Sequence, residues 1–381
     1  MTRLARGSTF RFVCAACYGL QSGASFAQGL QTVTRPAAPF IERRDDQRIV
    51  NFDLLVENRS PEPYRLVAIK LAVYDHAGKL QLARELNENG HPPALDTIGA
   101  RVLQPAAVLD IFQPFYTFGQ DIDLARMHFE LLFVAADAPS VPVVLTPERV
   151  VSIDLHPKEF DPPRYCLPMN GLVLVHDGHD FYSHHRRYNL TARYQSDPDS
   201  AVAANLFAYD FMRAAPDGAL VRGDFHQKEH WLSYGEPVFA PADGIIVAAV
   251  SNVPENEFDV AGDARQPADG KTADPDGLGN HVEIRHSDGR VSWLLHLQPG
   301  SLRVETGDRV HAGQLLGKVG FSGDSLFPHL HYNVTDGATY PSQGVPSYFR
   351  SFVRVLGTRR HRATSGQVDT GDLIESDSAC R

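Results

Sequence analysis

A short segment, Pro328-His329-Leu330-His331-Tyr332-Asn333-Val334, constrains this chain more than any other. Polar and apolar residues alternate along it, as in a β-strand whose successive side chains point to opposite faces of a sheet. His329, His331 and Asn333 then share one face, and the apolar residues between them face a core. Imidazole is a preferred zinc ligand, so this pattern favours a metal site on one face of a sheet, with two solvated histidines as the alternative.

The stretch 280–297 predicts a β-hairpin, because apolar residues alternate on both sides of an Asp-Gly turn. Counting outward from that turn pairs Ile284 with Trp293 and His281 with His296. The hairpin therefore predicts two more imidazoles, His281 and His296, on one face.

Several motifs follow one another in a characteristic order and with plausible spacing. They are Gly235 to Gly244, Gly279-Asn280-His281-Val282, Leu295-His296-Leu297, Val304 to Gly317, Gly320 to Gly323 and Pro328 to His331. In this order they resemble the lysostaphin-type (LytM-like) zinc metallopeptidases, over roughly residues 165–350. The resemblance implies an antiparallel β-sheet peptidase domain with one Zn²⁺, bound by a His, an Asp and the second His of His-x-His. By position, it makes His331 a zinc ligand and His296 and His329 the catalytic histidines, with His281 near the site.

The remaining two ligands are placed by the same resemblance. The segment 207–211 resembles the family segment that carries the ligand Asp, which makes Asp210 that ligand. The usual family pattern has the ligand His four residues earlier, where this chain has Leu206. Some family members have this His further upstream, which implies His185, with His184 as the alternative. The expected metal ligands are therefore His185, Asp210 and His331.

A competing motif and a probable turn also contain histidine. Residues 226–230 match His-x-x-Glu-His, which on a helix sets two His one turn apart beside a catalytic Glu. Only about two helical turns fit there, so a polar loop is the main alternative. His176 and His179 flank Asp177-Gly178 and are expected on the surface of a turn.

The rest of the chain divides into segments of different character. Residues 40–157 contain several stretches with strand alternation and no cluster of metal-ligand spacing, which predicts an immunoglobulin-like β-sandwich. Residues 158–164, which include Pro162-Pro163, are expected to be a linker, 165–350 the peptidase-like domain, and 351–381 a C-terminal tail. The expected fold is therefore mainly β, with a sandwich followed by a peptidase sheet.

The N-terminus has features of an export signal. Basic residues precede an apolar stretch, and Ser25-Phe26-Ala27 offers a small-residue cleavage site, so residues 1–27 are expected to be a signal peptide. The mature protein would then be periplasmic or extracellular. Removal of the signal peptide would take Cys14 and Cys17 away. It would leave Cys166 and Cys380, which could pair in an oxidising compartment.

Composition excludes some partners. The chain has 381 residues and a formal net charge of −10, which argues against binding nucleic acid, because phosphate neutralisation needs clustered Lys and Arg. No stretch approaches the ~18 apolar residues of a membrane helix. The resemblance implies a peptide substrate, such as the peptide cross-bridges of peptidoglycan.

Three functions stay open at this point. An active peptidase would use a zinc-activated water, with His296 and His329 handling protons or stabilising the oxyanion. A catalytically degenerate relative would bind cell wall or regulate another hydrolase. A carrier domain is the third, because Val304 to Gly317 also matches biotinyl-type barrels, although Lys318 lies past the turn where the modified Lys would be needed.

Overall fold

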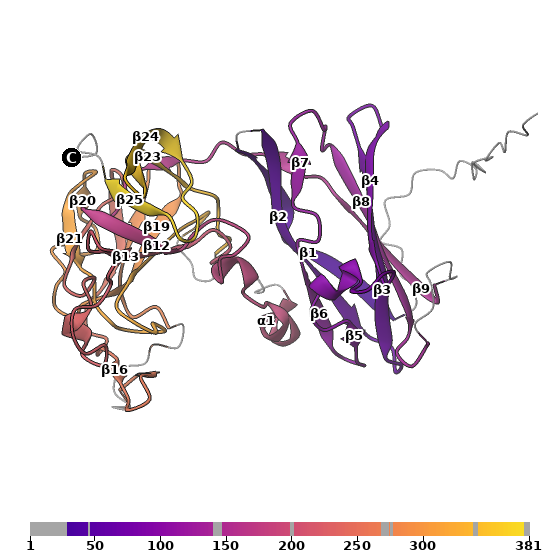
Figure 1. Ribbon diagram of the computed structural model, residues 1–381, viewed down its shortest axis with the longest axis horizontal. Helices are drawn as coiled ribbons and strands as arrows, with labels where there is room; N and C mark the ends of the chain where they lie inside the picture. Colours follow the sequence, from indigo (N-terminus) through magenta and orange to yellow (C-terminus); the bar gives the residue numbers. More distant parts are fainter. Residues whose placement is uncertain are drawn as a thin grey trace, which may run out of the picture.

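The computed structural model describes residues 29–44, 46–139, 147–198, 202–267, 274, 277–337 and 342–376. The expected signal peptide and the cysteines at positions 14, 17 and 380 lie outside these ranges. Cys166 is disulfide-bonded. Two β-rich halves lie side by side, with helix α1 (Thr191–Ser196) between them (Figure 1). Among the described residues, no helix has the length and apolar character needed to cross a membrane.

The N-terminal half is a sandwich of two five-stranded sheets. One sheet has the order β10-β1-β2-β6, with β7 also paired to β2, and the other has the order β4-β3-β8-β9, with β5 also paired to β3. The strands of the first sheet are β1 (Leu30–Arg44), β2 (Gln47–Asn58), β6 (Val108–Phe112), β7 (Thr117–Gly119) and β10 (Lys158–Glu159). Those of the second are β3 (Tyr64–Tyr74), β4 (Leu80–Asn87), β5 (Val102–Leu103), β8 (Arg126–Ala135) and β9 (Arg149–Leu155).

Apolar side chains from the two sheets meet in one core, where the rings of Phe52 and Phe129 lie 5.6 Å apart. The sandwich begins earlier than the expected residue 40, because β1 starts at Leu30 and pairs with β2 along its length. That the strand order is immunoglobulin-like stays a prediction.

Strand β2 is buried on both faces, and this links the sandwich to the second half. Its inward residues, such as Phe52 and Leu54, belong to the sandwich core. Its outward residues include Asn51 and Asp53, which are also buried. Outward-facing Leu55 packs in a separate cluster with residues of the second half, namely Leu190, Tyr194, Ala203, Leu206 and Phe207. One face of the sandwich is therefore an interface.

The second half is built on one eleven-stranded sheet, with the order β11-β23-β25-β12-β13-β22-β19-β18-β15-β20 and β24 paired to β23. The strands are β11 (Arg164–Tyr165), β12 (Leu172–Asp177), β13 (Tyr209–Arg213), β15 (Gly244–Val250), β18 (Asn280–Arg285), β19 (Val291–Leu297), β20 (Arg309–Val310), β22 (Leu330–Thr335), β23 (Tyr348–Leu356), β24 (Arg359–Gly366) and β25 (Leu373–Ser376). Two small ribbons flank it, β14 (Pro237–Phe239) with β21 (Leu315–Lys318) and β16 (Glu257–Phe258) with β17 (Ala264–Arg265).

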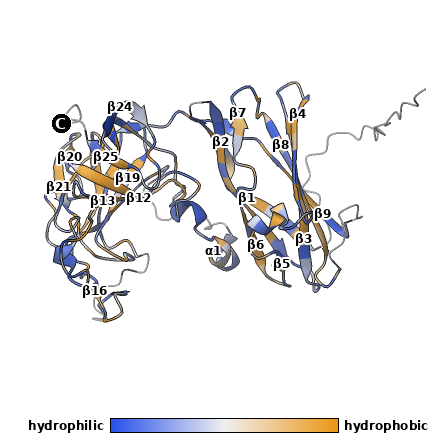
Figure 2. Ribbon diagram, viewed as in Figure 1, coloured by the Kyte–Doolittle hydropathy of each residue, from blue (hydrophilic) through white to orange (hydrophobic). Residues whose placement is uncertain are grey.

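The predicted strand around His331 is confirmed. In β22 the apolar residues Leu330, Tyr332 and Val334 belong to the main core of this half, as the alternation required. Figure 2 shows hydrophobic segments along strands of both halves, as two separate cores require. The mainly β fold is thus as expected, and it presents the polar side of β22 away from the core.

The expectation that residues 351–381 form a C-terminal tail is wrong for the residues that the structure describes, which extend to 376. Residues 348–376 form β23, β24 and β25, and β25 lies between β23 and β12 in the large sheet. Phe352 and Ile374 are fully buried there, so burial of apolar side chains holds this segment in the sheet. The basic run of residues 359–362 is exposed on β24.

The expected linker is also more ordered than its proline content indicated. Residues 158–159 form β10 beside β1, and residues 164–165 form β11 beside β23. Phe160, between these strands, packs on Phe40 at 4.5 Å between ring centroids. Only residues 160–163 therefore connect the two halves outside a strand.

The predicted hairpin exists, but its register differs by one residue. Strands β18 and β19 pair antiparallel, yet Ile284 lies opposite Ser292 rather than Trp293. The ladder is irregular between Asn280 and Val282, so His281 and His296 are not direct partners. The turn is longer than two residues, because the amide of His286 donates to the carbonyl of residue 290. Turn length sets hairpin register, and the Asp-Gly pair alone did not define that length.

Candidate metal centre

One half of the site comes from regular strands. Asp210 lies on β13 and is the Cα partner of His331 on the adjacent strand β22. The neighbouring residues Tyr209 and Tyr332 point into the core, so Asp210 and His331 both point to the opposite face. His329 lies on the same side, just before β22 begins. The sheet therefore brings the carboxylate of Asp210 together with the imidazoles of His331 and His329, which lie 121 and 119 residues after it in the chain.

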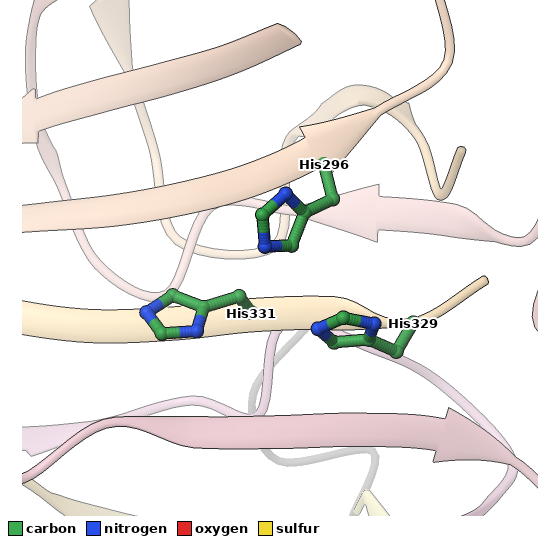
Figure 3. Close-up of side chains that lie close together, drawn as sticks. All are labelled: His296, His329 and His331. Atoms are coloured by element: carbon green, nitrogen blue, oxygen red, sulfur yellow. The ribbon is translucent and has the colours of Figure 1, made fainter. Parts of the chain in front are cut away.

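His296 approaches the same place from β19. Figure 3 shows its ring pointing from its own strand toward the strand that carries His329 and His331. The ring centroids lie 4.9 Å from His329 and 5.8 Å from His331. The backbone of His296 has φ +63°, in the left-handed region that non-glycine residues rarely adopt. Such strain is characteristic of functional sites, and here it accompanies the irregular ladder opposite His281.

The other half comes from an irregular segment that follows β12. Asp177 ends β12, and residues 185–187 form a single 3-10 turn, η2 (His185–Arg187). The amides of His184 and His185 donate to the carboxylate of Asp177, at 2.9 and 3.0 Å, and the hydroxyl of Ser183 donates to it at 2.7 Å. This carboxylate thus folds the segment back toward the sheet, where Asp177 is the strand partner of Asp210.

Three imidazole nitrogens surround one oxygen, Oδ1 of Asp210. Nδ1 of His331 lies 3.1 Å from it, Nε2 of His329 lies 3.3 Å from it, and Nε2 of His185 lies 3.7 Å from it. The rings of His185 and His331 are 4.7 Å apart and almost perpendicular. All these side chains are buried, so water does not screen their interaction.

This spacing fits a metal ion. Tetrahedral zinc with bonds of about 2.0–2.2 Å sets its ligand atoms about 3.3–3.5 Å apart. The distances from Oδ1 of Asp210 to Nδ1 of His331, 3.1 Å, and to Nε2 of His185, 3.7 Å, lie just below and just above that range. Nε2 of His331 is also buried without a hydrogen-bond partner among the described residues. The ligand-type groups there form two clusters, His296 with His329 and His331, and Asp177 with His184, His185 and Asp210, and these clusters meet at Asp210.

Of the two neighbouring histidines, His185 is better placed than His184. Its side chain is 7% exposed, whereas that of His184 is 63% exposed. Nε2 of His184 lies 4.0 Å from Oδ2 of Asp210, further than Nε2 of His185 lies from Oδ1. Nδ1 of His185 lies 2.8 Å from Asp177, the arrangement in which a carboxylate orients a metal-binding imidazole.

Electrostatics hold Asp210 ionised beside two imidazoles that stay neutral, those of His331 and His296. Burial lowers the pKa of His331 to about 4, and burial with its two histidine neighbours lowers the pKa of His296 well below its ordinary value. Burial opposes ionisation of Asp210, but His329 and His185 outweigh it and hold its pKa well below its ordinary value. Burial likewise opposes protonation of His329, and Asp210 reverses this and raises its pKa. A neutral imidazole can bind a metal, so this charge state suits a cation.

The two proposed proton-handling histidines each have one ring nitrogen occupied. Nδ1 of His296 lies 2.8 Å from the carbonyl oxygen of Ser322, which can only accept a hydrogen bond. Nδ1 of His329 lies 2.8 Å from the carbonyl oxygen of Phe327. Each Nδ1 therefore carries a proton, Nε2 of His296 is left to exchange one, and Nε2 of His329 faces Oδ1 of Asp210 at 3.3 Å. Their roles, like those of the three expected metal ligands, stay predictions.

Other sequence-based expectations fare differently. His281 belongs to neither cluster, and its nitrogens approach the carbonyl of Gly279 and, at 3.6 Å, Glu283. The alternative that residues 226–230 form a helix with a His-x-x-Glu-His site is wrong, because only a 3-10 turn, η4 (Lys228–His230), forms there. His226 and His230 each bond to Asp224 and join neither ligand-type cluster among the described residues.

Sequence reasoning missed Asp177 and misplaced His179. Asp177 was expected in a surface turn, yet it is buried and contacts both His184 and His185. Burial opposes its ionisation, but the hydrogen bonds from these two residues prevail and lower its pKa. His179 is 4% exposed and bonds to Tyr209. The only signal in the sequence was that Asp177 ends an apolar strand seven residues before the histidine pair.

Known proteins resemble part of this chain. The model of Peptidase family M23 matches residues 230–342. A peptidoglycan DD-endopeptidase, ShyC of Vibrio cholerae serotype O1, is 35% identical over 98 residues, which are 26% of this chain and 17% of that protein. A glycyl-glycine endopeptidase, ALE-1 of Staphylococcus capitis, is 37% identical over 112 residues, or 29% of this chain and 24% of that protein. The chain thus spans less than a quarter of the length of these two relatives.

Among solved structures, the catalytic domain of lysostaphin from Staphylococcus simulans is similar, with 24% identity and a TM-score of 0.24. The match covers 36% of this chain and 73% of that one. The family match includes His296, His329 and His331 but begins after Asp210, so it leaves His184, His185 and Asp210 outside.

Proposed function

We propose that this protein, whose residues 230–342 match the model of peptidase family M23, is a zinc-dependent endopeptidase that hydrolyses peptide bonds in peptidoglycan cross-bridges. M23 peptidases are zinc-dependent. The observation that carries the proposal is the convergence of His331 and His185 on Oδ1 of Asp210, at distances that suit tetrahedral zinc. We assign these three residues as the metal ligands.

Zinc bound there would supply a water of lowered pKa and polarise the scissile carbonyl. The protein's own contribution is to fix the ligands and to move protons. Asp177 orients His185 through its contact with Nδ1, as a carboxylate does for a metal-binding imidazole.

His296 and His329 would exchange protons through Nε2, because hydrogen bonds to carbonyl oxygens retain the proton on Nδ1 in each ring. Protonated, either could stabilise negative charge that develops on the carbonyl oxygen of the substrate. No carboxylate other than Asp177 and Asp210 belongs to the two ligand-type clusters of the described residues, so we assign the general acid–base role to this histidine pair.

The substrate class and the location rest on the relatives. Both named relatives are endopeptidases, and the name of one states that it acts on peptidoglycan. A protein with this substrate must reach the cell wall, which agrees with export to the periplasm or the exterior and with the expected signal peptide of residues 1–27. We propose a peptide substrate, and no nucleic-acid partner, because the chain carries a net charge of −10.

A second candidate function is that of a degenerate relative, which would bind cell wall or regulate another hydrolase without cleaving. One observation favours it: the family match starts at residue 230 and leaves two of the three proposed ligands outside. The carrier-domain alternative loses weight, because Val304 to Gly317 lies inside that match.

The test combines metal content with cleavage. Purified protein should contain about one zinc per chain, and incubation with peptidoglycan should release new amino termini at a rate that a chelator abolishes and zinc restores. Zinc without any new amino termini would favour the degenerate relative. Protein that neither retains nor takes up zinc would contradict the proposed function.

A further inference from the structure

Arg186, the residue after the proposed ligand His185, is buried as a whole side chain at the boundary between the two halves. It is 1% exposed, which is unusual for arginine. Its Nε donates to Oδ1 of Asn51 on β2 of the sandwich, at 3.0 Å, and its guanidinium lies 4.6 Å from the ring centre of Phe112 on β6. A cation from the second half is therefore enclosed by the sandwich.

The sandwich surrounds this cation with acids. Burial lowers the pKa of Arg186 to about 10, while Asp53, Glu42 and Asp110 oppose that shift. The same burial raises the pKa of Asp53 to about 8, which Arg186 in turn opposes. All three acids come from β1, β2 and β6, the sheet that faces the second half. The charge of Arg186 thus opposes the rise that burial causes in the pKa of Asp53 and of Asp110.

A cavity of about 20 Å³ touches both Arg186 and His185 and also Asp53. It is too small for a peptide or a sugar, so a ligand site is not the explanation for the buried cation. The burial of Arg186 is instead explained by contact between the sandwich and the metal centre.

A second connection reaches the other side of the centre. Nε2 of His179 lies 2.8 Å from Oε2 of Glu42, and both side chains are 1% exposed. Nδ1 of His179 lies 2.9 Å from the hydroxyl of Tyr209, the residue before Asp210. The sandwich therefore contacts the neighbours of two proposed ligands, Arg186 next to His185 and, through His179, Tyr209 next to Asp210.

We propose that the sandwich is a structural part of the metal centre: by enclosing Arg186 it positions the segment that carries His185, and zinc affinity depends on that contact. Arg186 is in this view a positioning residue. The irregular segment has only one 3-10 turn and the short helix α1 of its own, so it needs outside contacts to hold one geometry. The inference rests on the proposed function, because it names His185 as a ligand.

The test uses the full-length protein and the variant Arg186→Met. Zinc affinity, measured by competition with a chromophoric chelator, should fall about 10- to 100-fold, as for other residues that orient a ligand. The matched control is Arg65→Met. Arg65 is also a largely buried cation of the sandwich, paired with Glu88, and it belongs to the sheet that faces away from the second half. This control should lose stability and keep the zinc affinity of the wild type.

Two further variants keep the test decisive. Arg186→Lys retains the charge and should recover part of the affinity. If Arg186→Met does not fold, Arg186→Met with Asp53→Asn removes the cation together with one acid and should still bind zinc weakly. Equal affinity in the wild type and a folded Arg186 variant would overturn the inference, as would an equal loss in Arg65→Met.

Amide hydrogen exchange separates this inference from the proposed function. In metal-free protein, Arg186→Met should speed exchange across residues 183–190, and Arg65→Met should not. Failure of the wild type to bind zinc would contradict the proposed function, while the exchange measurement would still decide whether the sandwich holds the segment. Unchanged exchange there in Arg186→Met would overturn the inference.

Discussion

The two halves of the candidate metal centre differ in how they are built. His296, His329 and His331 lie on or beside hydrogen-bonded strands within the region that matches the peptidase family. His184 and His185 lie outside that region, on an irregular segment that is folded by Asp177 and packs against the sandwich. Strand pairing determines the geometry of the first group, here called the strand half of the centre, almost alone. The second group, here called the segment half, depends on contacts with residues far away in the chain.

The difference teaches where a metal site can vary. A His-x-His strand keeps its geometry as long as the sheet exists, because the pleat sets the direction of each side chain. A ligand on an irregular segment can move along the sequence if new contacts hold it. That is consistent with Leu206 standing where the family pattern has a His, and with His185 approaching Asp210 from further upstream.

The largest expected effect is on the strand half. His331→Ala should remove both zinc and activity, because it deletes a ligand that no neighbouring group replaces. Zinc content after dialysis and the rate of amino-terminus release measure the two effects. His311→Ala is the control, since His311 is exposed and belongs to neither cluster. Full zinc occupancy in His331→Ala would show that the strand half is not the metal-binding half.

His296→Ala should separate chemistry from metal binding. We expect zinc to remain and the rate to fall by about 10²–10⁴, the usual contribution of a general acid–base. The pH profile of the rate should also lose one limb, because a proton-transferring group is gone. If His296→Ala loses zinc, its proposed catalytic role is wrong and it is a ligand.

The segment half is tested by comparing neighbours. His185→Ala should lose zinc, whereas His184→Ala should retain it, because His184 is mostly exposed and further from Asp210. Chelator competition on both variants measures the difference. The reverse result would assign the ligand to His184.

Asp177→Asn should have a smaller effect than loss of His185. The amide keeps the shape but removes the charge beside Nδ1, so zinc affinity should fall by about 10- to 100-fold. Asp274→Asn is a control, because Asp274 also accepts backbone amides near the site but belongs to neither cluster. Identical zinc affinity in Asp177→Asn and wild type would show that Asp177 only shapes the backbone.

The last prediction concerns the pH dependence of stability, not zinc binding or cleavage. Burial raises the pKa of Asp53 from 3.8 to about 8, so between these values the folded protein retains a proton that the unfolded chain has lost. Stability should therefore fall as pH rises from about 4 to 8, at no more than about 1.4 kcal/mol per pH unit. Asp53→Asn lacks this titration. Urea unfolding at pH 5 and pH 8 should show the variant gaining relative to wild type at the higher pH, and parallel changes would contradict the assignment.

Local periodicity accounts for the part of the fold that was predictable. Alternation along residues 328–334 was enough to place Leu330, Tyr332 and Val334 in the core and His331 opposite them. The same reasoning failed for the register of β18 and β19, because the turn between them is one residue longer than the Asp-Gly pair indicated and this shifts the pairs next to it. It also failed for the expected C-terminal tail, because residues 348–376 contain the three strands β23, β24 and β25.

The sequence by itself determined the mainly β fold and the His-x-His strand, because strand alternation is a local property, and its resemblance to a known family predicted Asp210, His296, His329 and His331 as site residues. Only the tertiary structure showed that His185 lies nearer to Asp210 than His184 does, that Asp177 contacts both, and that Arg186 is buried against the sandwich. Those features depend on burial and on distances between β2, β12 and β13. No local pattern records such distances, since residues 51 and 186 become neighbours only where the sandwich packs against the second half of the chain.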